Sequence, residues 1–202
     1  VGYNFLFSKT FIKLKSKIEN SDHGKLISVR STVGQNIKFW RKKNFLKSVS
    51  VSKKLGGGIL NELSHEIHYL IELFGNLKIL SKNIRKSYFK KIDVSDSAFL
   101  LFINKKKITV SLIMDFYRND KFRQCHLIFE KATLIVDFIK GKIFLCKKDN
   151  VSKTIFSAKN DIEGSYVRQW QYIKKMLNKN NIDKKYFKTS LLTLETINRL
   201  NR

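Results

Sequence analysis

The chain has 202 residues, 43% of them hydrophobic, which is enough to bury the core of one domain. Its 41 Lys and Arg against 16 Asp and Glu give a formal net charge of +25. No apolar run approaches the ~18 residues of a membrane span, and Cys125 and Cys146 have neither metal nor redox spacing. We therefore exclude a membrane-spanning protein and a disulfide-stapled one, and expect free thiols in a cytoplasmic protein without a signal peptide.

The first third of the chain predicts a helix, a long strand and a loop. Residues 8–20 place Phe11, Leu14 and Ile18 on one helical face, and Ser8 is suited to cap that helix. Residues 26–39 alternate as a strand does, and residues 41–55 form a basic, serine-containing loop.

A helix opened by three glycines, Gly56 to Gly58, is predicted next. Its apolar residues recur at helical spacing and should face the core: Leu60, Leu63, Ile67, Leu70, Ile71 and Phe74. The polar flank carries Glu62, His65, Glu66 and Tyr69, and Gly75 stops the helix. From spacing alone this is an ordinary amphipathic helix with a solvated polar face, or a rigid support for reactive groups beside a sharp turn. Glu62-x-x-His65 also has di-iron spacing, but no second copy exists, so we expect no metal.

The rest of the chain predicts strands with short connections, followed by two helices. The strands are expected at 77–88, 98–104, 108–116, 125–129 with 133–138, and 142–146, and the helices at 165–177 and 190–200. Short connections favour antiparallel pairing. The expected fold is α+β: an open, mostly antiparallel sheet of about six strands with helices packed on one face. Residues 1–202 form one domain, with 1–22 as a lead-in helical segment and 165–202 as C-terminal helices.

Lysine supplies nearly all of the positive charge, since arginine occurs at only eight positions. The basic clusters are scattered over expected loops and strand ends, and no zinc-finger, RNP or basic heptad pattern accompanies them. We therefore expect no specific nucleic-acid partner. A large positive charge still attracts polyanions, and it would suit an anionic substrate.

Several segments, in the same order along the chain, resemble one enzyme family. Residues 56–75 resemble a "GGGxLx(D/E)LSHEIDYLxxLFG" stretch, and residues 1–7 resemble "VGYNxRF". Residues 24–30 are similar to "GxxxSVR", Trp40 to a "W+" element, residues 50–58 to "YSxxxxLGGG" and residues 92–98 to "xDVxDSA". Together they resemble the C-terminal domain of glucose-fructose oxidoreductase / inositol dehydrogenase / MocA-type (Gfo/Idh/MocA) oxidoreductases, densely over residues 1–118 and more loosely to about 200.

The resemblance implies half of a two-domain enzyme that moves a hydride between NAD or NADP and a sugar, cyclitol or nucleotide-sugar. The sequence holds no G-x-G-x-x-G after an early strand and no "EKP" lysine, so the Rossmann domain that binds the dinucleotide is expected to lie outside it. We expect a fragment that is inactive alone. The family also implies a homo-oligomer formed through the sheet face.

The resemblance assigns roles residue by residue. His65 matches the family histidine beside nicotinamide and substrate, and a near-neutral pKa suits it to acid/base catalysis. Glu62 matches the acidic residue that orients the substrate or the histidine. The expected substrate contacts are Trp40, Lys54, Gly57, Gly58 and Tyr69. Asp93 and Asp96 match family positions too, but we interpret them as solvated turn residues.

Three residues depart from the family pattern. His68 stands where aspartate is frequent, Leu6 replaces an arginine, and Ser8 replaces a histidine. These changes remove charged partners near the domain junction and put catalytic competence in question. The alternative function is a non-enzymatic basic module of the same fold that binds an anionic partner through its lysines.

Overall fold

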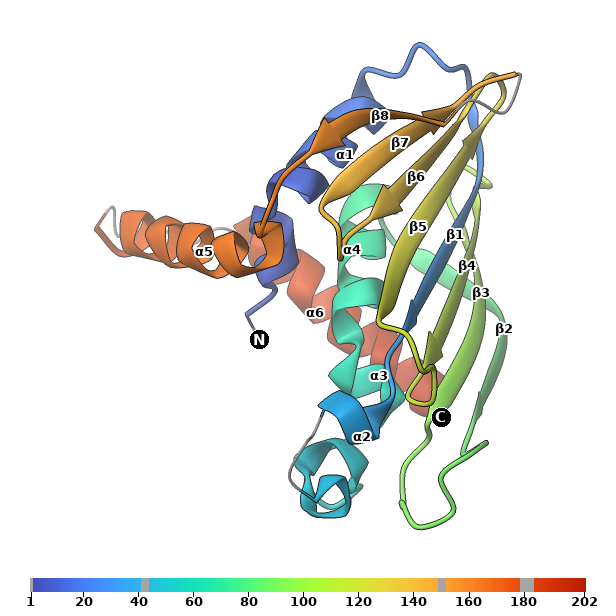
Figure 1. The fold of residues 1–202 in the computed structure, drawn as a ribbon, viewed down its shortest axis with the longest axis vertical. Coiled ribbons are helices and arrows are strands. Elements are labelled where there is room, and N and C mark those ends of the chain that lie inside the picture. Colours follow the sequence, from blue (N-terminus) through green and yellow to red (C-terminus); the bar gives the residue numbers. More distant parts are fainter. Residues whose placement is uncertain (1, 41–43, 149–151, 179–183) are drawn as a thin grey trace.

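The computed structural model describes residues 2–40, 44–148, 152–178 and 184–202. These residues form one eight-stranded open sheet with the order β2-β3-β4-β1-β5-β6-β7-β8, and helices cover one of its faces (Figure 1). The strands are β1 Leu26–Gly34, β2 Leu77–Arg85, β3 Ser97–Asn104, β4 Thr109–Asp115, β5 Phe122–Phe129, β6 Thr133–Asp137, β7 Lys142–Cys146 and β8 Ser152–Ser157. The helices are α1 Lys9–Glu19, α2 Ile37–Trp40, α3 Ile59–Glu62, α4 Ser64–Phe74, α5 Asp161–Asn178 and α6 Lys184–Asn201, with 3-10 turns at Asn4–Phe7, Phe45–Lys47 and Val49–Val51.

The predicted α+β class and the mostly antiparallel sheet are confirmed. Only β1 and β4 pair in parallel among the strands described, and the other neighbours are antiparallel. The sheet has eight described strands where about six were expected, and β8 is the one without a counterpart among the expected ranges. This edge strand reads Ser-Lys-Thr-Ile-Phe-Ser and has only two partly buried residues, so it lacks the alternation that marks a half-buried strand. The strand expected at 26–39 ends at Gly34, and α2 follows it.

The sheet buries alternate residues against the helices. Val29 and Val33 on β1 lie opposite Val110 and Met114 on β4, and all four are buried. Their neighbours along the strands point to the other face, which the described helices leave uncovered (Figure 1). That outer face carries partly exposed residues such as Phe99 and His126. Cys125 is buried on the inner face, Cys146 is partly buried, and both thiols are free.

The central helix differs from the expectation in two respects. Leu63 has φ −107° and ψ 25°, which interrupts the expected single helix between α3 and α4. The expected apolar stripe is buried from Leu60 to Ile71, but Glu66, His68 and Tyr69 are buried as well. The sheet lies on one side of α4, and helix α6 packs against another side. Most of α4 is therefore enclosed, and the helix lacks the solvated polar face that an amphipathic surface helix has. Gly75 ends the helix with φ 75°, as expected.

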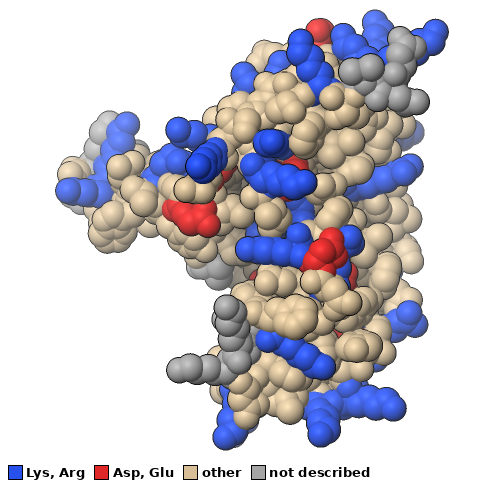
Figure 2. Space-filling view, in the orientation of Figure 1, with Lys and Arg blue, Asp and Glu red and all other residues tan. Residues whose placement is uncertain are grey.

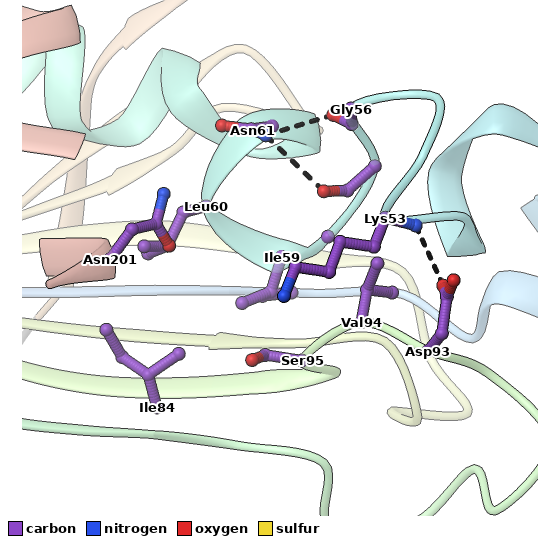
Figure 3. A pocket seen from close by; sticks show the side chains of 12 residues that line it. Lys53, Gly56, Ile59, Leu60, Asn61, Ile84, Asp93, Val94, Ser95 and Asn201 are labelled. Carbon is purple, nitrogen blue, oxygen red and sulfur yellow. Dashed lines mark hydrogen bonds between the residues drawn. The ribbon is translucent and has the colours of Figure 1, made fainter. Parts of the chain in front are cut away.

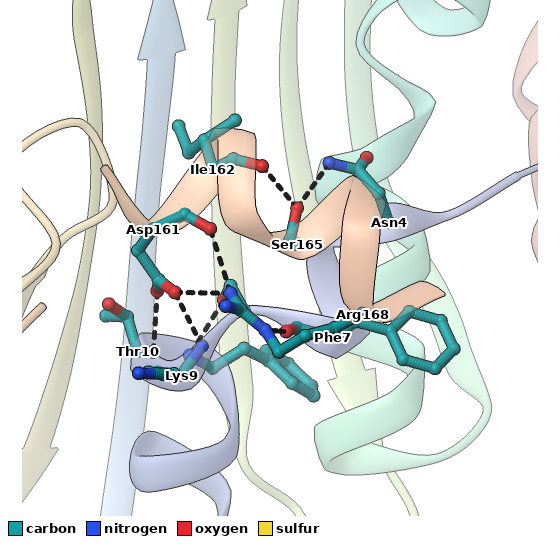
Figure 4. Close-up of polar contacts among 10 residues, drawn as sticks. Asn4, Phe7, Lys9, Thr10, Asp161, Ile162, Ser165 and Arg168 are labelled. Carbon is teal, nitrogen blue, oxygen red and sulfur yellow. Dashed lines mark hydrogen bonds and ion pairs between the residues drawn. The ribbon is translucent and has the colours of Figure 1, made fainter. Parts of the chain in front are cut away.

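The start of the chain is tied to α5 by a polar network (Figure 4). The Asp161 carboxylate accepts the backbone N–H groups of Lys9 and Thr10, both at 2.8 Å, and pairs with Arg168 at 2.7 Å. Lys9 and Thr10 begin helix α1. Ser8 caps α1 by accepting the N–H of Phe11 at 3.0 Å, which confirms its expected role. Side-chain oxygens thus satisfy three of the N–H groups that an α-helix leaves unpaired at its start.

None of the helices in the described ranges has both the length and the apolar character needed to cross a lipid bilayer.

Replacing Asp161 with Ala is expected to lower the free energy of unfolding by about 2 kcal/mol or more, because two buried N–H groups and Arg168 lose their acceptor. Urea unfolding followed by circular dichroism measures this loss. Asp120→Ala is the control, since the Asp120 carboxylate is 61% exposed in its pair with Arg118 and its loss should lower stability far less than the loss of Asp161. Equal losses would show that Asp161 is not a structural anchor.

Candidate functional site

The three glycines form a tightly bonded turn ahead of α3. Gly57 and Gly58 donate their N–H groups to the carbonyl oxygens of Ser52 and Ser50, both at 2.9 Å. The Gly58 φ of 108° favours glycine, and a Cβ added to Gly57 would overlap the carbonyl oxygen of Val49. These N–H groups are used within the chain, so the turn does not form a cradle of free donors for an anion.

A hollow of about 420 Å³ borders this turn (Figure 3). Polar groups reach it from Lys53, Asn61, Asp93, Ser95 and Asn201. The Lys53 side chain extends along the hollow, and its backbone N–H donates to the Asp93 carboxylate at 2.8 Å. Gly57 and Gly58 line this hollow, whereas Lys54 is exposed on the neighbouring turn. Lys54, the expected substrate contact, is not among the residues that line this hollow, whereas its neighbour Lys53 is, and the spacing of a loop does not reveal which of two adjacent lysines reaches it.

His65 lies in the first turn of α4, partly buried between aromatic rings. Its ring meets Tyr3 edge-on with centroids 5.3 Å apart, and Phe5 lies 6.0 Å away. The Nδ1 atom is buried without a hydrogen-bond partner. Burial first, and then the positive charge of Arg123, lower the pKa of His65 to about 4. The imidazole is therefore neutral at pH 7. Its pKa lies well below the near-neutral value expected from the sequence, which makes it a weaker base than expected.

Glu62 lies on the last turn of α3 and accepts the Ser50 hydroxyl at 2.8 Å. Because Ser50 belongs to the segment that also receives the Gly58 N–H, this contact links the carboxylate to the glycine turn. The described contacts of Glu62 thus hold the turn before α4.

A buried ion pair beside His65 was missed from the sequence. The fully buried Glu66 carboxylate receives Arg123 through two bonds, of 2.6 and 3.1 Å. The Arg123 guanidinium also lies 4.5 Å from the centre of the Phe5 ring, which His65 contacts from α4. Glu66 was placed on a solvated flank, and no local signal pairs it with an arginine 57 residues away.

A second hollow, of about 280 Å³, lies beyond Arg123. Trp40, Lys121 and Tyr166 line it with Arg123, at the point where the two parallel strands β1 and β4 end at Gly34 and Asp115. A Cβ at Gly34 would come within 2.6 Å of the Asp115 carboxylate, so only glycine leaves room there. The carboxyl ends of parallel strands are a common location for ligands, and an aromatic ring beside charged donors and acceptors suits a polyol.

The expectation that Tyr69 contacts substrate needs correction. Tyr69 has no exposed surface, and its hydroxyl lies 2.6 Å from the Ser31 hydroxyl on β1. Burial raises its pKa well above 10.0. The residue packs α4 against the sheet and has no surface left for a ligand.

The expectation that Asp96 is a solvated turn residue is wrong. It is fully buried and accepts the N–H groups of Ser87, Tyr88 and Phe89, at 2.7 to 2.9 Å. It holds the turn after β2, so it is not a solvated turn residue.

His68 lies fully buried behind His65. Its ring stacks on Tyr3 with centroids 3.6 Å apart, and neither ring nitrogen has a partner. Burial and the nearby His65 lower its pKa to about 3, against a smaller opposing effect of Glu72. Over the described ranges, no three His, Cys, Asp or Glu side chains come together in a way that could hold a metal ion.

No protein-family model matches the sequence, and none of the curated proteins compared with it matches either. Solved structures do match. The 3-ketoreductase KijD10 from Actinomadura kijaniata, in complex with NADP and TDP-benzene, superposes with a TM-score of 0.83 at 10% identity over 98% of this chain and 60% of its own. An oxidoreductase from Thermotoga maritima gives 0.80 at 13% identity, over 100% and 59%. An inositol dehydrogenase homolog from Azotobacter vinelandii, complexed with NAD+, gives 0.64 at 13% identity, over 77% and 42%.

These matches confirm the resemblance to Gfo/Idh/MocA-type NAD(P)-binding oxidoreductases at the level of the fold. The chain spans about 60% of the length of the first two structures. At these identities the likeness concerns the fold, and it carries no residue roles across.

Acid should destabilise the fold through the two histidines of α4. Their folded-state pKa values, about 4 and about 3, lie below the 6.5 of the unfolded chain. Stability is therefore fully present above pH 6.5 and falls as the pH drops from 6.5 toward 3. His68→Phe keeps the stack on Tyr3, and between pH 7 and 4.5 it should lose about 2 kcal/mol less stability than the unchanged chain. Urea titrations at both pH values measure this, and parallel losses would contradict a buried neutral His68.

Proposed function

We propose that this chain is the substrate-binding half of an NAD(P)-dependent oxidoreductase that acts on a sugar, cyclitol or nucleotide-sugar. The main support is a fold shared with oxidoreductases that carry NAD+ or NADP, together with a neutral imidazole at the start of α4. His65 is not among the residues that line either hollow, but Arg123, whose charge acts on it, lines the hollow beside Trp40. Proton transfer by such an imidazole is the contribution that this half would make.

The described residues do not fit the pyrophosphate of a dinucleotide. The N–H groups of Gly57 and Gly58 are bonded within the chain, and α3, which follows them, has only four residues. The dinucleotide would therefore be held by polypeptide outside these residues. When bound there, the dinucleotide would supply the hydride-transfer chemistry that these residues lack.

The residues of this half would handle the proton and the sugar. In the direction of oxidation, His65 would accept the hydroxyl proton as the hydride leaves the same carbon. Because its Nδ1 is enclosed, Nε2 is the ring atom proposed for this exchange. Trp40 would supply an apolar surface for the sugar ring, Arg123 and Asp115 would meet its hydroxyl groups, and Glu62 would hold the turn that positions α4.

We also propose that the outer sheet face forms the homo-oligomer contact. Described helices leave this face uncovered, and it carries the 39% exposed Phe99 on β3 with partly buried residues such as Ile113 and Ile135 on its neighbours. An uncovered apolar sheet face is suited to pairing with another copy.

The alternative of a basic binding module finds less support in the surface. Lysine and arginine side chains spread over the whole face seen in Figure 2, from the tip of α5 to the lower end of the sheet. They do not gather into one groove. A polyanion would therefore meet a diffuse field that salt screens.

His65→Ala, made in the longest natural chain that contains these residues, should lower kcat by about 100-fold or more. The mutant should keep its KM within a few-fold, since binding by Trp40 and Arg123 remains. Steady-state kinetics with NAD+ or NADP and a panel of sugars and cyclitols measure both values.

His23→Gln is the matched control, because His23 lies before β1 and packs against Phe129, outside both hollows. It should leave kcat unchanged. An unchanged kcat in folded His65→Ala would overturn the acid/base role, and binding of heparin without nicotinamide binding would favour the alternative.

A further inference from the structure

The proposed reaction makes no use of the hollow beside the glycine turn, here called the glycine-turn hollow. Three parts of the chain form its walls: the loop and turn from Lys53 to Gly58, the segment before β3 that holds Ser95, and the end of α6 at Asn201 (Figure 3). None of its lining residues also lines the hollow beside Trp40. The glycine-turn hollow is therefore a separate cavity.

Hydrogen bonds hold all three walls in place. The Asp93 carboxylate fixes the loop through a backbone N–H at 2.8 Å, and the Ile59 N–H donates to the Ser95 carbonyl oxygen at 3.1 Å. The Lys82 ammonium donates to the Leu200 carbonyl oxygen at 2.9 Å, which fixes the end of α6. These bonds join segments that lie far apart in the sequence. The shape of the hollow is therefore set by the fold, and a ligand would not have to order its walls.

Three polar side chains reach the glycine-turn hollow with their bonding capacity unused. Over the described ranges, the Lys53 ammonium, the Ser95 hydroxyl and the Asn201 amide make neither a hydrogen bond nor an ion pair. The Lys53 side chain crosses the hollow, so its ammonium lies at the far end from the Asp93 carboxylate (Figure 3). An ammonium, a hydroxyl and an amide can all donate hydrogen bonds, so three donors from three walls meet at one hollow.

The rest of the lining is largely apolar. Ile59, Leu60 and Val94 are buried beneath the hollow, and Ile84 of β2 is partly buried at its side. A cavity of about 420 Å³ with apolar walls and a few polar groups has the size and character of a site for a small molecule. The apolar part of the lining would suit a short aliphatic group.

The charge of the hollow favours an anion. A cation would meet the Lys53 ammonium, and the described residues hold no group of side chains that could bind a metal ion. Asp93 is the one acidic residue of the lining, and its carboxylate already accepts a backbone N–H. The net charge of +25 adds a field that attracts anions.

We propose that the glycine-turn hollow is a second binding site, which takes a small organic acid: a carboxylate or phosphate group on an aliphatic body of a few carbon atoms. Lys53 binds the oxyanion, and Ser95 and Asn201 donate to its oxygens. The aliphatic body lies on the apolar lining. The site needs neither His65 nor the hollow beside Trp40, so it stands or falls independently of the proposed reaction.

Saturation-transfer difference NMR tests the site in the longest natural chain that contains residues 1–202. The probes are butyrate and butyl phosphate, titrated at constant ionic strength, and neutral butyramide is the control ligand. We expect at least one anion to bind, and Lys53→Ala to weaken its binding by about ten-fold or more, because a charged hydrogen bond is lost. Lys54→Ala is the matched control, since Lys54 is exposed and does not line the hollow, and it should leave the dissociation constant unchanged.

A second variant keeps the test open if Lys53→Ala does not fold. Ser95→Ala removes a hydroxyl that has no bond to lose, and it should weaken binding of the same anion by about three-fold or more. Equal weakening in Lys53→Ala and Lys54→Ala would show diffuse attraction to the net charge and overturn the site. Binding of butyramide as tight as that of the anions, or no binding of either anion, would overturn it as well.

Discussion

The buried ion pair between Glu66 and Arg123 is the interaction on which the candidate site depends. A fully buried carboxylate is tolerated only with a partner, so α4 and β5 must stay in the register that brings the two residues within 2.6 Å. The same contact places the guanidinium over Phe5 and near His65. One pair therefore fixes the position of the helix, supplies a donor to the hollow beside Trp40, and adds to the burial that lowers the pKa of His65.

The enclosure of α4 explains its other unusual residues. His68 and Tyr69 point in directions about 100° apart on the helix, and both are enclosed: one stacks on Tyr3 and the other bonds to Ser31 of the sheet. The departures from the family pattern at the chain start have structural roles as well. Ser8 caps α1, and Leu6 packs against the core. The residues that replace charged ones thus serve the fold.

The sequence predicted the parts of the fold that follow from local periodicity. The strands at β3 and β7, the Ser8 cap and the Gly75 stop each have a short-range signal, and the structure has all four. Long-range contacts carry no such signal. The Glu66–Arg123 pair joins residues 57 positions apart, and Asp161 caps a helix that begins 152 positions earlier. An amphipathic pattern also says which side of a helix is apolar, but not whether a second layer covers the polar side. For that reason Glu66 and Tyr69 were expected on a polar flank, whereas both are buried.

Helix α5 is a second case in which the amphipathic pattern does not reveal which side of the helix is buried. Its exposed apolar side, with Tyr166, Trp170, Ile173 and Leu177, would ordinarily be expected to be the buried one, and burying it would turn the helix by about 110°. The hydrogen bonds of Asp161, Ser165 and Arg168 to the chain start prevent that rotation, because each would leave a buried polar group without a partner. Two costs therefore compete at this helix: exposed apolar surface in the domain alone, and unsatisfied polar groups if the helix turned. A partner that covers the exposed apolar side removes the first cost without incurring the second, so the sequence of α5 is consistent with a domain that works only as part of a larger assembly.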